Sequence, residues 1–106
     1  MVPLSTEHGF GASITATAGS PATLAVCGEI DIAVIDWFSG ELGQHIASAP
    51  DVLVLDLSGV TFIDSSGLAV LVSTSRRVAV RISAASDVVR RAIETTGLAE
   101  ALQLAP

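Results

Sequence analysis

The sequence contains no lysine, and its arginines are confined to one segment. Residues 1–75 hold eight acidic residues and neither Lys nor Arg, which gives this part a formal charge of −8. Residues 76–106 hold five Arg and three acidic residues, which gives +2 and a net charge of −6 for the chain. Proteins that bind nucleic acid need a basic surface to neutralise phosphates. The acidic balance therefore argues against direct binding to nucleic acid.

Cysteine is almost absent as well. Cys27 is the single thiol of the chain, so no internal disulfide can form, which fits a reducing compartment. Cys27 falls in an expected core strand, and we predict that it packs there as a small hydrophobic residue. No apolar run approaches the ~18–20 residues that cross a bilayer, and the N-terminus shows no secretory signal. We expect a cytoplasmic protein without a membrane partner.

The composition favours one folded domain, because half of the 106 residues are hydrophobic. After an irregular start at residues 1–9, alternation predicts a hairpin of strands at 10–17 and 23–27. Asp31 is expected to cap a helix whose apolar stripe runs from Ile35 to Ile46, although Gly40 and Gly43 should weaken that helix or let it approach the sheet closely.

The second half of the chain continues the alternation of strands and helices. An apolar run at residues 52–63 predicts a buried strand, and Leu68, Leu71 and Val72 share one face of a helix that follows it. Residues 78–83 predict another strand, and Ser86 is expected to cap a helix that ends at Gly97. The predicted fold is α/β, with a single layer of mixed, mostly parallel β-sheet packed with helices in the order β-β-α-β-α-β-α.

The junction between the buried strand and the next helix carries the motif DSSG at residues 64–67. Enzymatic use of its serines is improbable on chemical grounds: the two histidines, His8 and His45, both precede the serines, and no G-x-S-x-G elbow is present. One Cys and two distant His offer no metal-ligand spacing, and no phosphate-binding loop occurs. We therefore predict no catalytic residue, no metal and no cofactor.

Two interpretations of DSSG remain from its chemistry alone. Its Asp or Ser could simply cap the helix. Alternatively, the start of the helix could accept a phosphate, because its free N–H groups and dipole favour negative charge. A phosphorylated serine there would add a charge of about −1.5 to −2 without melting the helix.

The sequence resembles the STAS domains, and most closely the free-standing bacterial anti-sigma factor antagonists. The resemblance rests on GEID at residues 28–31, on residues 52–68, which include DSSG, and on residues 88–98, VVRRAIETTGL. It covers residues 10–104 of a single STAS domain spanning 1–106. The resemblance implies an antagonist that binds an anti-sigma factor serine kinase while unphosphorylated and so frees a sigma factor. A PP2C-type phosphatase would reverse the phosphorylation.

The resemblance also implies the site residues. Ser65 matches the phosphorylated serine, and the implied partner-binding residues are Asp31, Asp64, Ser65, Ser66, Gly67 and Leu68. The chain departs from the family in a helix of only about ten residues after the motif, followed by Arg76 and Arg77 in place of a glycine-containing connection. Two alternatives stay open. One is a STAS interaction subunit of a lipid-transport or sensory complex that is never phosphorylated, and the other is a nucleotide-binding STAS module.

Overall fold

We analysed the protein as a computed structural model, which describes residues 4–7, 11–17, 21, 23–48 and 50–106. The described elements follow one another as β1 (Leu4–Glu7), β2 (Ser13–Thr17), β3 (Thr23–Ile30), α1 (Ile35–Ile46), β4 (Val52–Ile63), α2 (Ser65–Ser75), β5 (Ala79–Ala85) and α3 (Asp87–Thr95). From β2 onward this is the predicted order. Residue 10, the first of the predicted hairpin, and residues 18–20 and 22 between its two strands lie outside the described residues.

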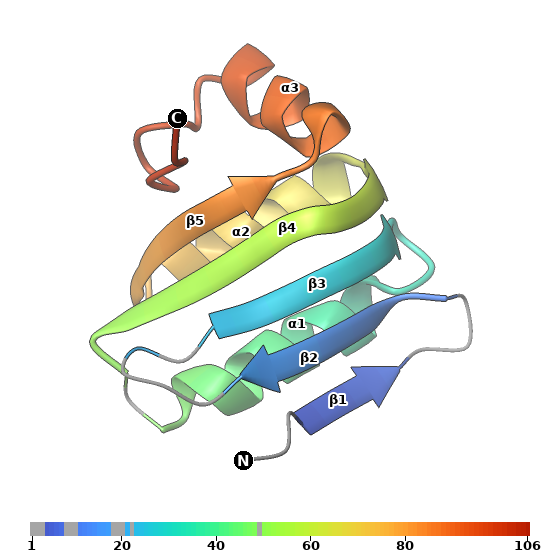
Figure 1. Cartoon of the computed structure of the whole chain (residues 1–106), viewed down its shortest axis with the longest axis vertical. Coiled ribbons are helices and arrows are strands. Elements are labelled where there is room, and N and C mark those ends of the chain that lie inside the picture. The colour runs from blue at the N-terminus through green and yellow to red at the C-terminus, as the bar shows by residue number, and fades with distance from the viewer. Residues whose placement is uncertain (1–3, 8–10, 18–20, 22, 49) are drawn as a thin grey trace.

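The strands form one mixed sheet in the order β1-β2-β3-β4-β5, so each strand pairs with its neighbour in the chain (Figure 1). The pairs β1–β2 and β2–β3 are antiparallel, which confirms the predicted hairpin. The pairs β3–β4 and β4–β5 are parallel. The expectation of an irregular start was wrong for residues 4–7, because β1 pairs with β2 and adds a second antiparallel pairing to a sheet predicted to be mostly parallel.

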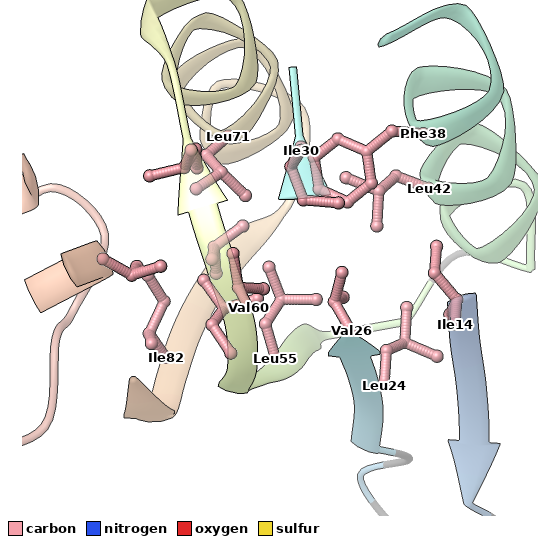
Figure 2. Close-up of a cluster of buried hydrophobic side chains, with 14 of the residues drawn as sticks. Ile14, Leu24, Val26, Ile30, Phe38, Leu42, Leu55, Val60, Leu71 and Ile82 are labelled. Carbon is pink, nitrogen blue, oxygen red and sulfur yellow. The ribbon is translucent and has the colours of Figure 1, made fainter. Parts of the chain in front are cut away.

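Helices α1 and α2 cover the same face of the sheet, and α3 lies beside β5 together with the C-terminus (Figure 1). The buried side chains of the sheet, among them Val26 and Leu55, point toward Phe38 and Leu42 of α1 and Leu71 of α2 (Figure 2). All five are at most 1% exposed. This core between the sheet and the two helices fixes where each helix begins, and so positions the DSSG segment.

Helix α1 starts later than predicted, and Asp31 does not cap it. The residue before the helix is Val34, whose side chain makes no capping hydrogen bond. Asp31 instead accepts a hydrogen bond from the backbone N–H of Ala33 at 3.0 Å, and so forms a local turn that competes with helix. Gly40 and Gly43 neither break the helix nor bring it closer to the sheet, since a Cβ at either position would meet no atom within 4 Å.

Helix α3 follows the predicted boundaries. The Ser86 hydroxyl accepts the N–H of Val89 at its start, and Gly97 follows its end with a φ of +75°. The N–H of Leu98 bonds to the carbonyl of Ile93 at 3.0 Å, which closes the end of the helix. The last residues then return to the sheet, where Leu104 bridges Ile82 of β5 in parallel, a contact that the sequence did not predict.

Cys27 is exposed, contrary to the predicted packing in the core. On β3 the side chains of Leu24 and Val26 point into the core, so Cys27 points to the opposite face of the sheet. It lies opposite Gly59 of β4, where an added Cβ would stand 2.5 Å from the Cys27 sulfur. The thiol therefore occupies the space left by the absent side chain of Gly59.

Candidate functional site

The three strands β3, β4 and β5 run parallel, so their carboxyl ends face the same way. The segments that leave these ends start α1, α2 and α3 (Figure 1). DSSG follows the middle strand of the three, at the start of α2. This is the edge of an α/β sheet at which binding residues commonly gather.

Asp64 caps α2. Its backbone is extended, with φ −108° and ψ −174°, and its Oδ1 accepts the N–H groups of Ser66 and Gly67 at 3.0 and 3.1 Å. The Ser66 hydroxyl donates to the same oxygen. This hydroxyl bond is the largest cause that lowers the pKa of Asp64 below its ordinary value of 3.8. Burial opposes it as the second-largest effect, and the backbone N–H groups of Gly67, Ile32 and Ser66 lower the pKa further. Asp64 is a carboxylate at neutral pH, and these hydrogen bonds stabilise its charged form.

The second carboxylate oxygen of Asp64 reaches the loop after β3. Oδ2 accepts the backbone N–H of Ile32 at 3.2 Å, and the N–H of Asp64 itself donates to the carbonyl of Ile30 at 3.3 Å. Asp64 thus ties the β3–α1 loop to the start of α2. Because Asp31 is the neighbour of Ile32, the structure brings the two predicted acidic residues to the same edge of the sheet. The role of Ile32 was missed from the sequence, since a backbone donor leaves no sequence signal.

The two serines of the motif have different environments. Ser66 is half-buried, and its hydroxyl is bonded to Asp64. Ser65 is the first residue of α2 and is exposed, and within the described part of the chain its hydroxyl makes no hydrogen bond. Ser65 is therefore the serine of this pair that solvent and a second protein can reach. Its modification remains a prediction.

Gly67 is buried where α2 meets the ends of β3 and β4. An added Cβ would lie 2.7 Å from Cγ1 of Ile63 and 3.0 Å from the carbonyl oxygen of Ile30. A side chain would therefore push the start of the helix away from the sheet. Leu68, the next residue, is half-buried and packs against the core. Gly67 and Leu68 thus fix the position of the helix start, whereas contact of either with a partner stays a prediction.

No group of three or more His, Cys, Asp or Glu among the described residues could hold a metal ion. His45 is in the last turn of α1, away from the carboxyl ends of the strands, and His8 lies outside the described residues. Trp37 is half-buried and packs against the core. None of the described helices is both long and apolar enough to span a membrane.

Comparison with known proteins assigns the chain to a family. Residues 13–106 match the family model of the STAS domain. The anti-sigma-F factor antagonist RsfB of Mycobacterium tuberculosis is 34% identical over 99 residues, which cover 87% of this chain and 81% of the relative. A crystal structure of an anti-sigma factor antagonist from Mycobacterium paratuberculosis superposes with a TM-score of 0.84 at 27% identity, covering 95% of this chain and 91% of that one.

The fold extends to a more distant protein. The unphosphorylated anti-sigma factor antagonist SpoIIAA shares the architecture with a TM-score of 0.69 at 19% identity, over 88% of both chains. The phosphorylated form of the Bacillus cell fate determinant SpoIIAA gives a TM-score of 0.61 at 17% identity, over 88% of this chain and 91% of that one. With the family model matching nearly all of its described elements, this chain belongs to the STAS domain family.

Proposed function

We propose that the chain is an anti-sigma factor antagonist, a regulator that acts by binding rather than by catalysis. In its unphosphorylated form it binds an anti-sigma factor serine kinase and thereby releases a sigma factor. Phosphorylation of Ser65 by that kinase ends the binding, and a PP2C-type phosphatase restores it. The relatives named as anti-sigma factor antagonists support this role.

The proposal rests on the different hydrogen bonding and exposure of the residues in DSSG. Asp64 and Ser66 hold the start of α2, while the hydroxyl of Ser65 is exposed and, among the described contacts, unbonded. A kinase can therefore reach Ser65 without breaking the hydrogen bonds by which Asp64 caps α2. A phosphate on Ser65 would also leave the helix in place, since the start of a helix favours an anion.

The charge around Ser65 supports the switching step. Asp64 is a carboxylate at neutral pH, and its hydrogen bonds stabilise this charged form by lowering its pKa. A phosphate on the next residue would raise the local charge from about −1 to about −3. When a partner covers this surface, the phosphate loses hydration beside a like charge, which disfavours binding. A loss of about 3 kcal/mol weakens binding more than a hundredfold.

The test is a kinase reaction with the anti-sigma factor kinase of the organism that encodes the chain and ATP, followed by mass spectrometry of the modified peptide. We expect one phosphate on the wild-type protein, on Ser65, and none on Ser65→Ala. The matched control is Ser66→Ala, which removes the neighbouring hydroxyl and should still be labelled. Full labelling of Ser65→Ala would refute the site. Wild-type protein that neither binds the kinase nor accepts phosphate would refute the function.

A further inference from the structure

Strand β5 forms one edge of the described sheet, and its sequence is of a kind that pairs readily with other strands. Residues 78–85 read VAVRISAA, so they are mostly β-branched or small, contain no proline and carry one charge, on Arg81. Strands of this composition pair with other chains when their outer side is open. A structural feature that covers this side of β5 therefore controls whether the protein self-associates.

The cover is the C-terminal segment 103–105, called the strap below, which lies beside β5 (Figure 1). The N–H of Ile82 donates to the carbonyl of Gln103 at 3.2 Å, and the carbonyl of Ile82 accepts the N–H of Ala105 at 3.0 Å. Both backbone groups of Ile82 that point away from β4 are thus occupied. Leu104 and Ile82 form an isolated bridge, so within the described part of the chain the strap pairs with β5 at one position.

A small set of contacts holds the strap. Gln103 has a φ of +47°, a left-handed conformation that is unfavourable for residues other than glycine. The N–H of Leu104 donates to the carbonyl of Ala99 at 2.9 Å. From α3, Nη1 of Arg90 donates to the carbonyl of Ala105 at 2.8 Å. Because this charged bond joins the strap to a different element, Arg90 acts as a latch.

We propose that the outer edge of β5 is a concealed pairing site for a second copy of this chain, and that the strap, latched by Arg90, controls access to it. When the strap opens, two copies of β5 pair antiparallel across a two-fold axis at Ile82. Each Ile82 exchanges both N–H···O bonds with its counterpart, which replaces the two bonds lost from the strap. The contact is isologous, as in most homodimers.

The charge pattern of β5 favours a second copy as the occupant. With the axis at Ile82, Arg81 of one copy lies opposite Ser83 of the other, so the single charge of the strand meets a neutral hydroxyl and not another arginine. Leu102, just before the strap, is 0% exposed and can stay in the core when the strap opens. This edge runs along β5, whereas Ser65 follows β4, so the inference does not depend on the proposed function.

Two full-length variants test the latch. Arg90→Ala removes the side-chain bond to the strap, and Ala105→Pro removes the N–H that bonds to Ile82. In dilute protein the amide hydrogen of Ile82, followed by NMR, should exchange roughly tenfold faster in either variant, since each loses a hydrogen bond that holds the strap. Arg91→Ala removes an exposed guanidinium at the next position and is the matched control, with unchanged exchange. Unchanged exchange in both variants would refute the latch.

Analytical ultracentrifugation of the Arg90→Ala, Ala105→Pro double variant over a range of concentrations tests the pairing. This variant should form a dimer that the wild type and the control variant do not form. Adding Ser83→Glu places an acid opposite Arg81 of the other copy, and adding Ser83→Lys places a second cation there. Each pair occurs twice in the dimer, so the Ser83→Glu form should dimerise at least about tenfold more tightly than the Ser83→Lys form. Both changes lose the same hydrogen bond to β4, which cancels in the comparison.

A folded double variant that stays monomeric at every concentration would refute the pairing site. A dimer of equal affinity in the wild type would refute the strap as its cover, and equal effects of the two Ser83 changes would refute the pairing at Ile82. Melting temperatures verify folding. If the double variant does not fold, Arg90→Ala alone, which keeps every residue of the strap, should show the dimer at higher concentration, and its absence there would equally refute the site.

Discussion

The carboxylate of Asp64 should be a measurable source of stability, because it serves two elements at once. Asp64→Ala removes the cap of α2, which is worth roughly 1 kcal/mol in other helices. It also leaves the N–H of Ile32 without its acceptor, which costs about another 1 kcal/mol. We therefore expect the free energy of unfolding to fall by about 2 kcal/mol. Asp64→Asn keeps one oxygen acceptor and should lose roughly half as much.

Urea unfolding, followed by the fluorescence of Trp37, measures this loss. Trp37 is the single tryptophan and packs against the core, so its signal reports the global transition. With a urea dependence of about 1.5 kcal/mol per molar, the midpoint of Asp64→Ala should fall by about 1.3 M. Ser66→Ala, which removes one donor to the same carboxylate, serves as the control and should move the midpoint less. An unchanged midpoint for Asp64→Ala would refute the assigned role of the cap.

The same stabilisation has a defined pH dependence. The hydrogen bonds lower the pKa of Asp64 below 3.8 in the folded protein, so the unfolded chain binds this proton more tightly. The contribution is therefore fully present above about pH 5 and is lost as the pH falls below about 4, through the folded-state pKa. The difference in stability between wild type and Asp64→Asn should be constant from about pH 5 to 8 and shrink below about pH 4. A difference that grows in acid would contradict the assignment.

Two glycine substitutions should have opposite effects on the free energy of unfolding, measured by the same urea titration. Gly67→Ala should destabilise by about 1–3 kcal/mol, because its Cβ would press on Ile63 and on the carbonyl of Ile30; wild-type stability would show that the helix start is loosely packed. Gly40→Ala should stabilise by about 0.5–1 kcal/mol, because the position is helical, exposed and clear of neighbours; a lower midpoint would show that the helix needs glycine there.

The sequence predicted the elements that are marked by a long apolar run or by capping residues at both ends. The run at residues 52–63 and the Ser86 and Gly97 signals correspond to β4 and to the two ends of α3. Strand β1 was missed because a four-residue edge strand gains its stability from pairing with β2 rather than from its own pattern. Cys27 was misplaced because Leu24, Ala25, Val26 and Cys27 are all apolar, so their pattern does not tell which face of the sheet the helices cover.

The local part of the site was predicted from the sequence, and its long-range contacts were not. The DSSG motif marks the start of α2 by its side chains, and Asp64 does cap that helix. The bond from Asp64 to Ile32 joins residues 32 positions apart through a backbone donor, so no local pattern encodes it. Asp31 was assigned to a cap because Asp favours both caps and local turns, and the folded chain uses the turn. Contacts through backbone groups that are far apart in the chain cannot be predicted from the sequence alone.

The strand order affects which ligands can bind at the carboxyl ends of β3, β4 and β5. In doubly wound sheets the order reverses once, neighbouring crossovers leave in opposite directions, and a crevice opens between them for a small ligand. Among the described strands the order runs from β1 to β5 without reversal, and both parallel crossovers place their helices on one face (Figure 1). The loops after β3, β4 and β5 therefore line up as a continuous rim. A rim of this kind favours a broad macromolecular contact over an enclosed nucleotide.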